Sequence, residues 1–400
     1  DHDPQLALSA DRLVDLGPGP GRAGGRLLWS GPPVELLGPE GPDTPTRRWL
    51  GGELAVRTSR KISREEGFPL ILDGLSRHNV ANVVLGIQVG GINLITGVSG
   101  AGKTALLDAA VARLRTEGAF GRIVTVDADP IGRTPRSNPA TYTGAFDPLR
   151  DLFAATPGAK VLGMGKGHFS FNTAGGRCEA CEGAGVLEVG MRYLGAVDLV
   201  CDACGGRRFH PEVLSVKIDG LSIADVLEGS IQEAAGRFGA HPKLARILGA
   251  LVDLGLGYLP LGQPATTLSG GEAQRVKLAA ELARATTPAL IALDEPSTGL
   301  HAVDVAVLLA AFDRLCERGH TLLVVDHDLD LVRAADRITE LGPGSGPEGG
   351  HVIAAGTPGE IEACVDAPTG AELRDWSRSR ATALRGRSGP LQEALRGEPG

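Results

Sequence analysis

The stretch Leu268-Ser269-Gly270-Gly271-Glu272-Ala273-Gln274-Arg275 decides the fold, although it is not distinctive alone. Ser269 is a good N-cap for a helix that starts near Glu272, and the two glycines leave the first backbone N–H groups of that helix uncovered. Such a helix start carries the positive end of the helix dipole and binds anions. A plain glycine-rich cap would be the better interpretation of an isolated octet, so the surrounding sequence has to decide.

A phosphate-binding loop lies upstream, at Gly97-Val98-Ser99-Gly100-Ala101-Gly102-Lys103-Thr104. The apolar run 92–96 predicts a buried strand before this loop, and 105–114 predicts a helix after it. In this strand–GxxxxGKT–helix order, the glycines let backbone N–H groups face the phosphates of a nucleotide. Lys103 would reach phosphate oxygens and the Thr104 hydroxyl would be placed for Mg²⁺, so ATP with Mg²⁺ is the predicted ligand.

An acidic pair follows the octet. The run 289–294 predicts a second buried strand that ends in Asp294, which would hold Mg²⁺ through water, while Glu295 would orient the hydrolytic water. A third strand is predicted at 321–325, and a neutral His327 at its end could donate to a γ-phosphate oxygen. Octet, loop and acidic pair together predict an α/β ATP-binding cassette ATPase, with Ser269, Gly270 and Gly271 in its signature loop.

Four cysteines form two CxxC pairs, Cys178 with Cys181 and Cys201 with Cys204. Two such knuckles supply four thiolates in a tetrahedron, so a closed structural Zn²⁺ site is predicted, with a hairpin at 186–199 between the knuckles. Two redox dithiols are the weaker alternative, because no thioredoxin-like βαβ unit surrounds either pair. Further along, 213–218 predicts a strand, and 222–228 and 242–253 predict helices.

The composition is that of a globular protein: 400 residues, 42% hydrophobic and 22% charged. The net charge of −8 means that any nucleic-acid surface is a local basic patch. No apolar run approaches the ~20 residues that span a bilayer, and the first residues are not those of a signal peptide. We therefore expect a cytoplasmic protein without a membrane partner, and the missing initiator Met suggests a fragment.

Basic and aromatic side chains crowd the cysteine module. They could form a DNA surface, or the aromatic residues could be the small core of the module and the basic residues solvated. Without the motifs around it, the second interpretation would be the better one. The set comprises Lys166, His168, Arg177, Arg192, Arg207 and Arg208, with Phe169, Phe171, Tyr193 and Phe209.

Residues 1–33 repeat without a gap at 326–358, with about half of the positions identical. A duplicated unit is the economical explanation, so the chain is expected to start near the end of one cassette and then to contain a second. The expected domains are the end of the first cassette at 1–33, a linker at 34–75, the phosphate-loop part of the second cassette at 76–150, an inserted signature and zinc region at 151–260, the remaining cassette at 261–362, and a polar, partly disordered tail at 363–400.

This layout resembles UvrA, the damage-recognising component of the bacterial excinuclease, because the phosphate loop and the signature lie about 170 residues apart with a four-cysteine module between them. The resemblance covers roughly residues 1–373. It implies that this chain is the C-terminal half of such a protein. The matching stretches are 97–104, 130–138, 141–144, 169–172, 175–181, 223–227, 255–258 and 261–279.

The resemblance implies a helical signature subdomain, a homodimer, and two cassettes packed head to tail, so that each ATP lies between the loop of one cassette and the signature of the other. Lys103, Thr104, Asp294, Glu295 and His327 would then form one half-site, and the octet would serve a site completed by His2 and by a first cassette absent from this chain. Damaged duplex DNA and a UvrB-like helicase are the implied partners, in nucleotide excision repair and without nuclease activity of its own.

One position departs from the family. The usual Mg²⁺-sensing Gln is replaced by Ala128, which cannot coordinate a metal, so slower hydrolysis is predicted. A UvrA-like self-resistance protein that removes DNA-bound drugs is therefore an alternative. The ATPase component of a membrane transporter is a weaker one, because the zinc insertion and the tandem cassette argue against it.

Overall fold

The computed structural model describes residues 4–19, 21, 24–51, 70–127, 129–191, 195–284 and 287–376. The chain divides into two compact units. Residues 1–127 and 286–400 form one, called here the core unit, and residues 128–285 form the other, the inserted unit. The domain boundaries expected from the sequence stay predictions, and the segment 377–400 lies outside the described residues.

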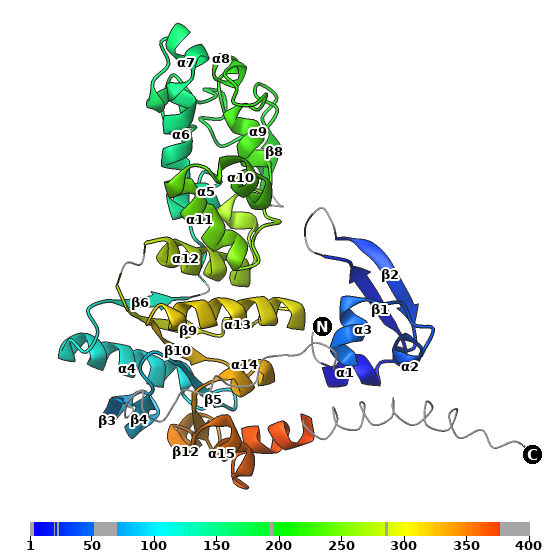
Figure 1. Cartoon of the computed structure of the whole chain (residues 1–400), viewed down its shortest axis with the longest axis vertical. Helices are drawn as coiled ribbons and strands as arrows, with labels where there is room; N and C mark the ends of the chain where they lie inside the picture. Colours follow the sequence, from blue (N-terminus) through cyan, green and yellow to red (C-terminus); the bar gives the residue numbers. More distant parts are fainter. Residues whose placement is uncertain are drawn as a thin grey trace, which may run out of the picture. The chain divides into compact units, whose positions relative to one another are not determined.

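A six-stranded sheet is the centre of the core unit, in the order β12-β11-β5-β10-β9-β6 (Figure 1). The five strands from β11 to β6 are parallel, and β12 is antiparallel to β11. The apolar runs of three central strands, β5, β9 and β10, are buried on both faces, as in parallel sheets generally. The strands are β5 (Ile92–Gly97), β6 (Ile123–Val126), β9 (Leu290–Asp294), β10 (Thr321–Val325), β11 (Arg337–Gly342) and β12 (His351–Gly356).

Helices cover both faces of this sheet. The connection from β5 to β6 through α4 (Lys103–Glu117) runs one way across the sheet, and the connections through α13 (Ala302–Glu317) and α14 (Leu329–Ala334) run the other way. Because such crossovers are right-handed, α4 lies on one face and α13 and α14 lie on the opposite face (Figure 1). The loops that follow β5, β9 and β10 therefore meet at one edge of the sheet.

Two hairpins and several short helices complete the core unit. The antiparallel strands β3 (Leu70–Arg77) and β4 (Val80–Ile87) pack on α4 and share its apolar core. A second hairpin pairs β1 (Leu13–Gly17) with β2 (Arg26–Gly31). The short helices are α1 (Pro4–Ser9), α2 (Pro33–Leu37), α3 (Pro45–Leu50) and α15 (Pro358–Ala363), and the chain is also helical over 368–376.

The inserted unit is mostly helical. Its predicted helices form, and the predicted hairpin between the cysteine pairs is β7 (Val186–Met191) with β8 (Gly195–Val200). The helices are α5 (Pro139–Thr143), α6 (Phe146–Ala155), α7 (Pro157–Val161), α8 (Pro211–Ser215), α9 (Ile223–Glu228), α10 (Ile231–Phe238), α11 (Pro242–Asp253) and α12 (Gly270–Arg284).

The strand predicted at 213–218 is wrong. Residues 211–215 form α8 instead, because Pro211 fixes the first helical turn and Val213 donates its N–H to His210 O rather than to a neighbouring strand. Only Ile218 makes a bridge, to Leu221. The segment 34–75, expected to be a linker, contains α3 and the start of β3. No helix among the described residues is long and apolar enough to cross a bilayer.

Candidate ATP and zinc sites

The phosphate loop joins β5 to α4, as predicted. Gly97, Gly100 and Gly102 have φ angles of +135°, +78° and +100°, a region that L side chains rarely adopt. Gly102 is also the N-cap of the fifteen-residue helix α4 and offers no side chain to its first N–H groups. The loop therefore ends in an uncapped helix start, which suits phosphate oxygens.

Residues 341–350, called here the brace segment, contact the phosphate loop and hold its backbone. The N–H groups of Gly346 and Gly350 donate to Gly100 O and Ala101 O, at 3.0 and 2.8 Å. Asn79, at the β3–β4 turn, donates to Gly346 O at 3.0 Å. A Cβ atom added to Gly97 would lie 2.1 Å from Leu341 O. The shape of the loop is therefore fixed by its packing, and these residues fit a nucleotide phosphate.

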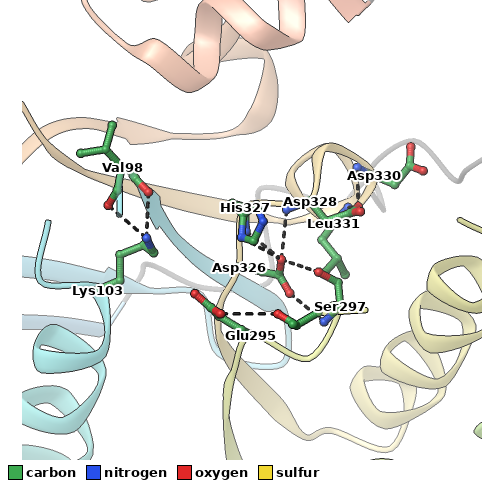
Figure 2. Close-up of polar contacts among 11 residues, drawn as sticks. Val98, Lys103, Glu295, Ser297, Asp326, His327, Asp328, Asp330 and Leu331 are labelled. Atoms are coloured by element: carbon green, nitrogen blue, oxygen red, sulfur yellow. Dashed lines mark hydrogen bonds and ion pairs between the residues drawn. The ribbon is translucent and has the colours of Figure 1, made fainter. Parts of the chain in front are cut away.

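Lys103 and Thr104, which the motif assigns to phosphate and Mg²⁺, make contacts within the protein. Lys103 Nζ donates to Gly97 O and Val98 O, at 2.9 and 3.1 Å, which places the ammonium group inside the loop (Figure 2). Thr104 Oγ1 donates to Asp294 Oδ2 at 3.0 Å, although the two residues are 190 positions apart. Burial raises the pKa of Asp294, the Thr104 hydroxyl lowers it, and the neighbouring Glu295 raises it. A hydroxyl and a carboxylate so placed suit Mg²⁺.

Glu295 and His327 follow adjacent strands, β9 and β10. Glu295 has φ of +48°, in the left-handed region, and its N–H donates to Val325 O at 2.8 Å. Its side chain is exposed, as is His327, whose side chain is 67% exposed. Both side chains lie at the edge of the sheet that carries the phosphate loop, where a water and a γ-phosphate could meet them.

The octet forms the N-terminus of α12 in the inserted unit. Ser269 Oγ accepts from Glu272 N at 3.2 Å, and the Glu272 carboxylate accepts from Ser269 N at 2.8 Å, which completes a capping box. The helix starts at Gly270, two residues before the predicted start. Tyr258 donates its hydroxyl to the other Glu272 oxygen, so the signature glutamate is held on both sides.

The four cysteines converge, as predicted. The Sγ atoms of Cys178, Cys181, Cys201 and Cys204 all lie within 4.8 Å of one another, and Cys181 and Cys204 are 3.7 Å apart. A tetrahedral Zn²⁺ with Zn–S bonds of about 2.3 Å needs S···S separations of about 3.8 Å, so the cluster fits zinc. Gly185 N donates to Cys181 Sγ, and Gly205 N donates to Cys201 O, which shapes the knuckles.

The basic and aromatic set around this cluster is mostly structural. Phe169, Phe171 and Phe209 are buried. The Phe171 ring stacks on Phe146 and meets Phe209 edge to face, and Phe169 contacts Phe153 at a tilt. Four of the five described basic side chains have side-chain partners: Lys166 pairs with Asp151, Arg177 with Glu179, Arg207 with Asp225, and the Arg208 guanidinium covers the Phe171 ring. The aromatic core of the second interpretation is therefore present, but these arginines are paired with acids or packed on a ring and are not simply solvated. Arg192 and Tyr193 lie outside the described part.

Three residues of these sites were missed by the sequence reasoning: Asn79, Tyr258 and Asp326. Asp326 directly precedes His327, is fully buried, and accepts hydrogen bonds from the segments that follow β9 and β10. The signal that could have found it is an acid between a five-residue apolar strand and a candidate catalytic histidine. His2 and Ala128, which the resemblance singled out, lie outside the described residues.

These features define the ATP-binding cassette class. The phosphate loop is bonded to an acidic strand end, a histidine follows the adjacent strand, and a capped signature helix lies in an inserted unit. No protein-family model matches the sequence. Proteins named UvrABC system protein A do match. The one from Thermus thermophilus is 46% identical over 392 residues, or 93% of this chain and 41% of its own length. The one from Bacillus subtilis is 43% identical over 393 residues, with 94% and 41% covered.

A solved structure, UvrA2 from Deinococcus radiodurans, superposes with a TM-score of 0.88 and 42% identity. It is matched over 94% of this chain and 47% of its own. The chain is thus similar to UvrA proteins over almost its whole length, and it spans about two fifths of the length of the curated relatives that it matches.

Proposed function

We propose that this chain is part of a UvrA-like ATPase of nucleotide excision repair, which binds and hydrolyses ATP to control its hold on damaged duplex DNA and the loading of a UvrB-like helicase. The observation that carries the proposal is the 46% identity with UvrABC system protein A over almost the whole chain. The hydrogen bond between Thr104 and Asp294 supports it, because the phosphate loop and the acidic strand end meet there as ATP chemistry requires.

Each residue of the half-site has a task in this proposal. Lys103 and the start of α4 bind the phosphates, and Thr104 and Asp294 hold Mg²⁺, which offsets charge on the phosphate oxygens when bound. Glu295 orients the attacking water, and His327 donates to a γ-phosphate oxygen. The cysteine cluster holds Zn²⁺ and stabilises the arm that carries it.

The exposed face of the β1–β2 hairpin supports a further cassette, the first one, as a partner of this chain. Leu16 and Leu27 pair directly and are 64% and 63% exposed. Their counterparts in the sequence repeat, Leu341 and Val352, pair in the same register and pack against the core around the phosphate loop. The exposed face of the hairpin is therefore complementary to another phosphate-loop domain, such as a first cassette. Replacing both leucines with Asp should abolish association with a UvrA first cassette supplied separately.

The test of the ATPase proposal measures nucleotide turnover by the chain together with a UvrA first cassette supplied separately, with duplex DNA that carries one bulky adduct or none, and transfer of that DNA to UvrB. We expect turnover that Glu295→Gln lowers at least ~100-fold, while Glu317→Gln, an exposed acid on α13, leaves it unchanged. Retention of damaged over undamaged duplex is expected as well. No turnover, no nucleotide binding and no retention together would contradict the proposal, and tolerance to a DNA-binding drug without UvrB transfer would favour the self-resistance alternative.

A further inference from the structure

A fully buried carboxylate joins the two segments that carry Glu295 and His327. Asp326, at the end of β10, accepts hydrogen bonds from Ser297 N at 3.0 Å and Ser297 Oγ at 2.6 Å. It also accepts from His327 N at 2.7 Å and Asp328 N at 3.0 Å. Figure 2 shows these contacts converging on one side chain between the strand ends.

Both segments lie beyond the ends of their strands, and one backbone hydrogen bond, from Glu295 N to Val325 O at 2.8 Å, continues the β9–β10 pairing into the first of them. Glu295 adopts a left-handed φ, and Ser297 lies in the turn that leads from β9 toward α13. His327 lies in the gap between β10 and α14. Because β9 and β10 pair side by side, with Asp294 opposite Val325, one carboxylate at the end of β10 can bond to both. The Asp326 carboxylate thus makes a side-chain bridge between the segment after β9 and the segment after β10.

The bridge is not the helix cap of α14. Asp328 fulfils that task, with Oδ1 accepting from Asp330 N at 2.9 Å and from Leu331 N at 3.2 Å. The helix can therefore start without Asp326. A carboxylate with no exposed surface is expensive to bury unless donors surround it, and here the donors come from the catalytic segments.

We propose that Asp326 is a positioning residue for hydrolysis: it fixes the Glu295 turn against the His327 segment, so that both side chains keep the separation that one water and one γ-phosphate need. The proposal rests on the ATPase function proposed above. Asp326 touches neither substrate nor metal in this assignment. It acts through the backbone of its neighbours, through the Ser297 hydroxyl, and through the His327 ring, whose Nδ1 lies 3.9 Å from Asp326 Oδ1.

The test uses Asp326→Asn, which keeps the shape of the side chain but turns one acceptor oxygen into an NH2 donor. Hydrogen–deuterium exchange at single amides is measured first, without nucleotide. The amides of Ser297 and His327 should exchange at least about tenfold faster than in the unmodified chain, since each loses a bond to a charged acceptor. The amides of Asp330 and Leu331 should keep their protection. Asp328→Asn is the matched control, and it should leave the Ser297 amide protected.

Kinetics are measured next. Asp326→Asn should lower kcat for ATP about tenfold and leave KM within about twofold, because Lys103 and Thr104 still bind the nucleotide. Ser297→Ala, which removes one bond and keeps the rest, should show a smaller loss of kcat, and it serves as the second variant if Asp326→Asn unfolds.

Unchanged exchange at Ser297 and His327, or equal losses in kcat and in ATP affinity, would overturn the proposal. If the unmodified chain, mixed with a first cassette, shows no turnover at all, the proposed function fails, whereas the exchange data still decide whether Asp326 joins the two segments.

Discussion

Replacing Gly97 with Ala tests whether the phosphate loop is fixed by its packing. The glycine ends β5 and begins the loop, with φ of +135°. Its neighbour across the sheet is Leu341, on β11, and the new Cβ would lie 2.1 Å from the carbonyl oxygen of that residue. Backbone atoms cannot rotate away as a flexible side chain can, so the strands themselves must separate.

The expected loss of unfolding free energy has two parts. A backbone conformation reserved for glycine costs an alanine about 1–3 kcal/mol. Moving a carbonyl from 2.1 Å to ordinary contact displaces the end of β11 by roughly 1 Å, and each backbone hydrogen bond weakened there costs about 1 kcal/mol. We expect Gly97→Ala to reduce the free energy of unfolding of the core unit by about 4 kcal/mol, a large share of the 5–15 kcal/mol typical of a domain.

Tryptophan fluorescence in a urea titration is a suitable assay, because Trp29, Trp49 and Trp376 all belong to the core unit. Gly90 has φ of +75°, and a Cβ added there would meet no other atom within 4 Å. Gly90→Ala therefore isolates the conformational cost, about 1 kcal/mol. Gly121→Ala has open space and an ordinary φ, and should change little. If Gly97→Ala and Gly90→Ala lowered stability equally, the packing argument would be refuted.

Three further predictions follow from single side chains. Thr104→Val should weaken Mg²⁺-dependent ATP binding about tenfold by removing the hydroxyl beside Asp294, whereas Thr116→Val on the same helix should not, as fluorescence titration with labelled ATP will show. Cys204→Ser should abolish the binding of one Zn²⁺ per chain, measured by elemental analysis, while Cys364→Ser keeps it. Burial beside Asp330 and Asp326 raises the pKa of Asp328 to about 6. The folded state thus holds this proton more tightly than the unfolded state, and stability is lost as the pH rises from about 4 through about 6. Asp328→Asn should flatten that part of the profile of urea midpoint against pH, because Asn also caps helices.

Motifs whose chemistry lies in consecutive residues were predicted well. The loop at 97–104 shows its glycines, lysine and hydroxyl within eight positions, directly after an apolar run, and the cysteine pairs show their knuckles within four. The capping box of Ser269 and Glu272 is likewise local. In these cases the residue types and their spacing are themselves the structural requirement.

Contacts between distant segments were not predictable in the same way. Asp326 could be read as one more acid near a histidine, because its partner Ser297 lies 29 positions upstream. Phe169 and Phe171 could be read as exposed stacking platforms, since burial depends on helices that the sequence does not place around them. The strand predicted at 213–218 was wrong for a local reason. Three of its six residues are β-branched and favour a strand, but Pro211 starts a helix just before them.

The brace segment also sets an order of events during synthesis. The strand that precedes the phosphate loop, β5, has β10 and β11 as its two neighbours, and both follow the inserted unit in the chain. A growing polypeptide therefore completes its cysteine cluster and its signature helix while β5 still has neither neighbour in the sheet. The loop gains its final shape only after residue 350 has left the ribosome, so the ATP half-site is among the last parts of the described chain to form.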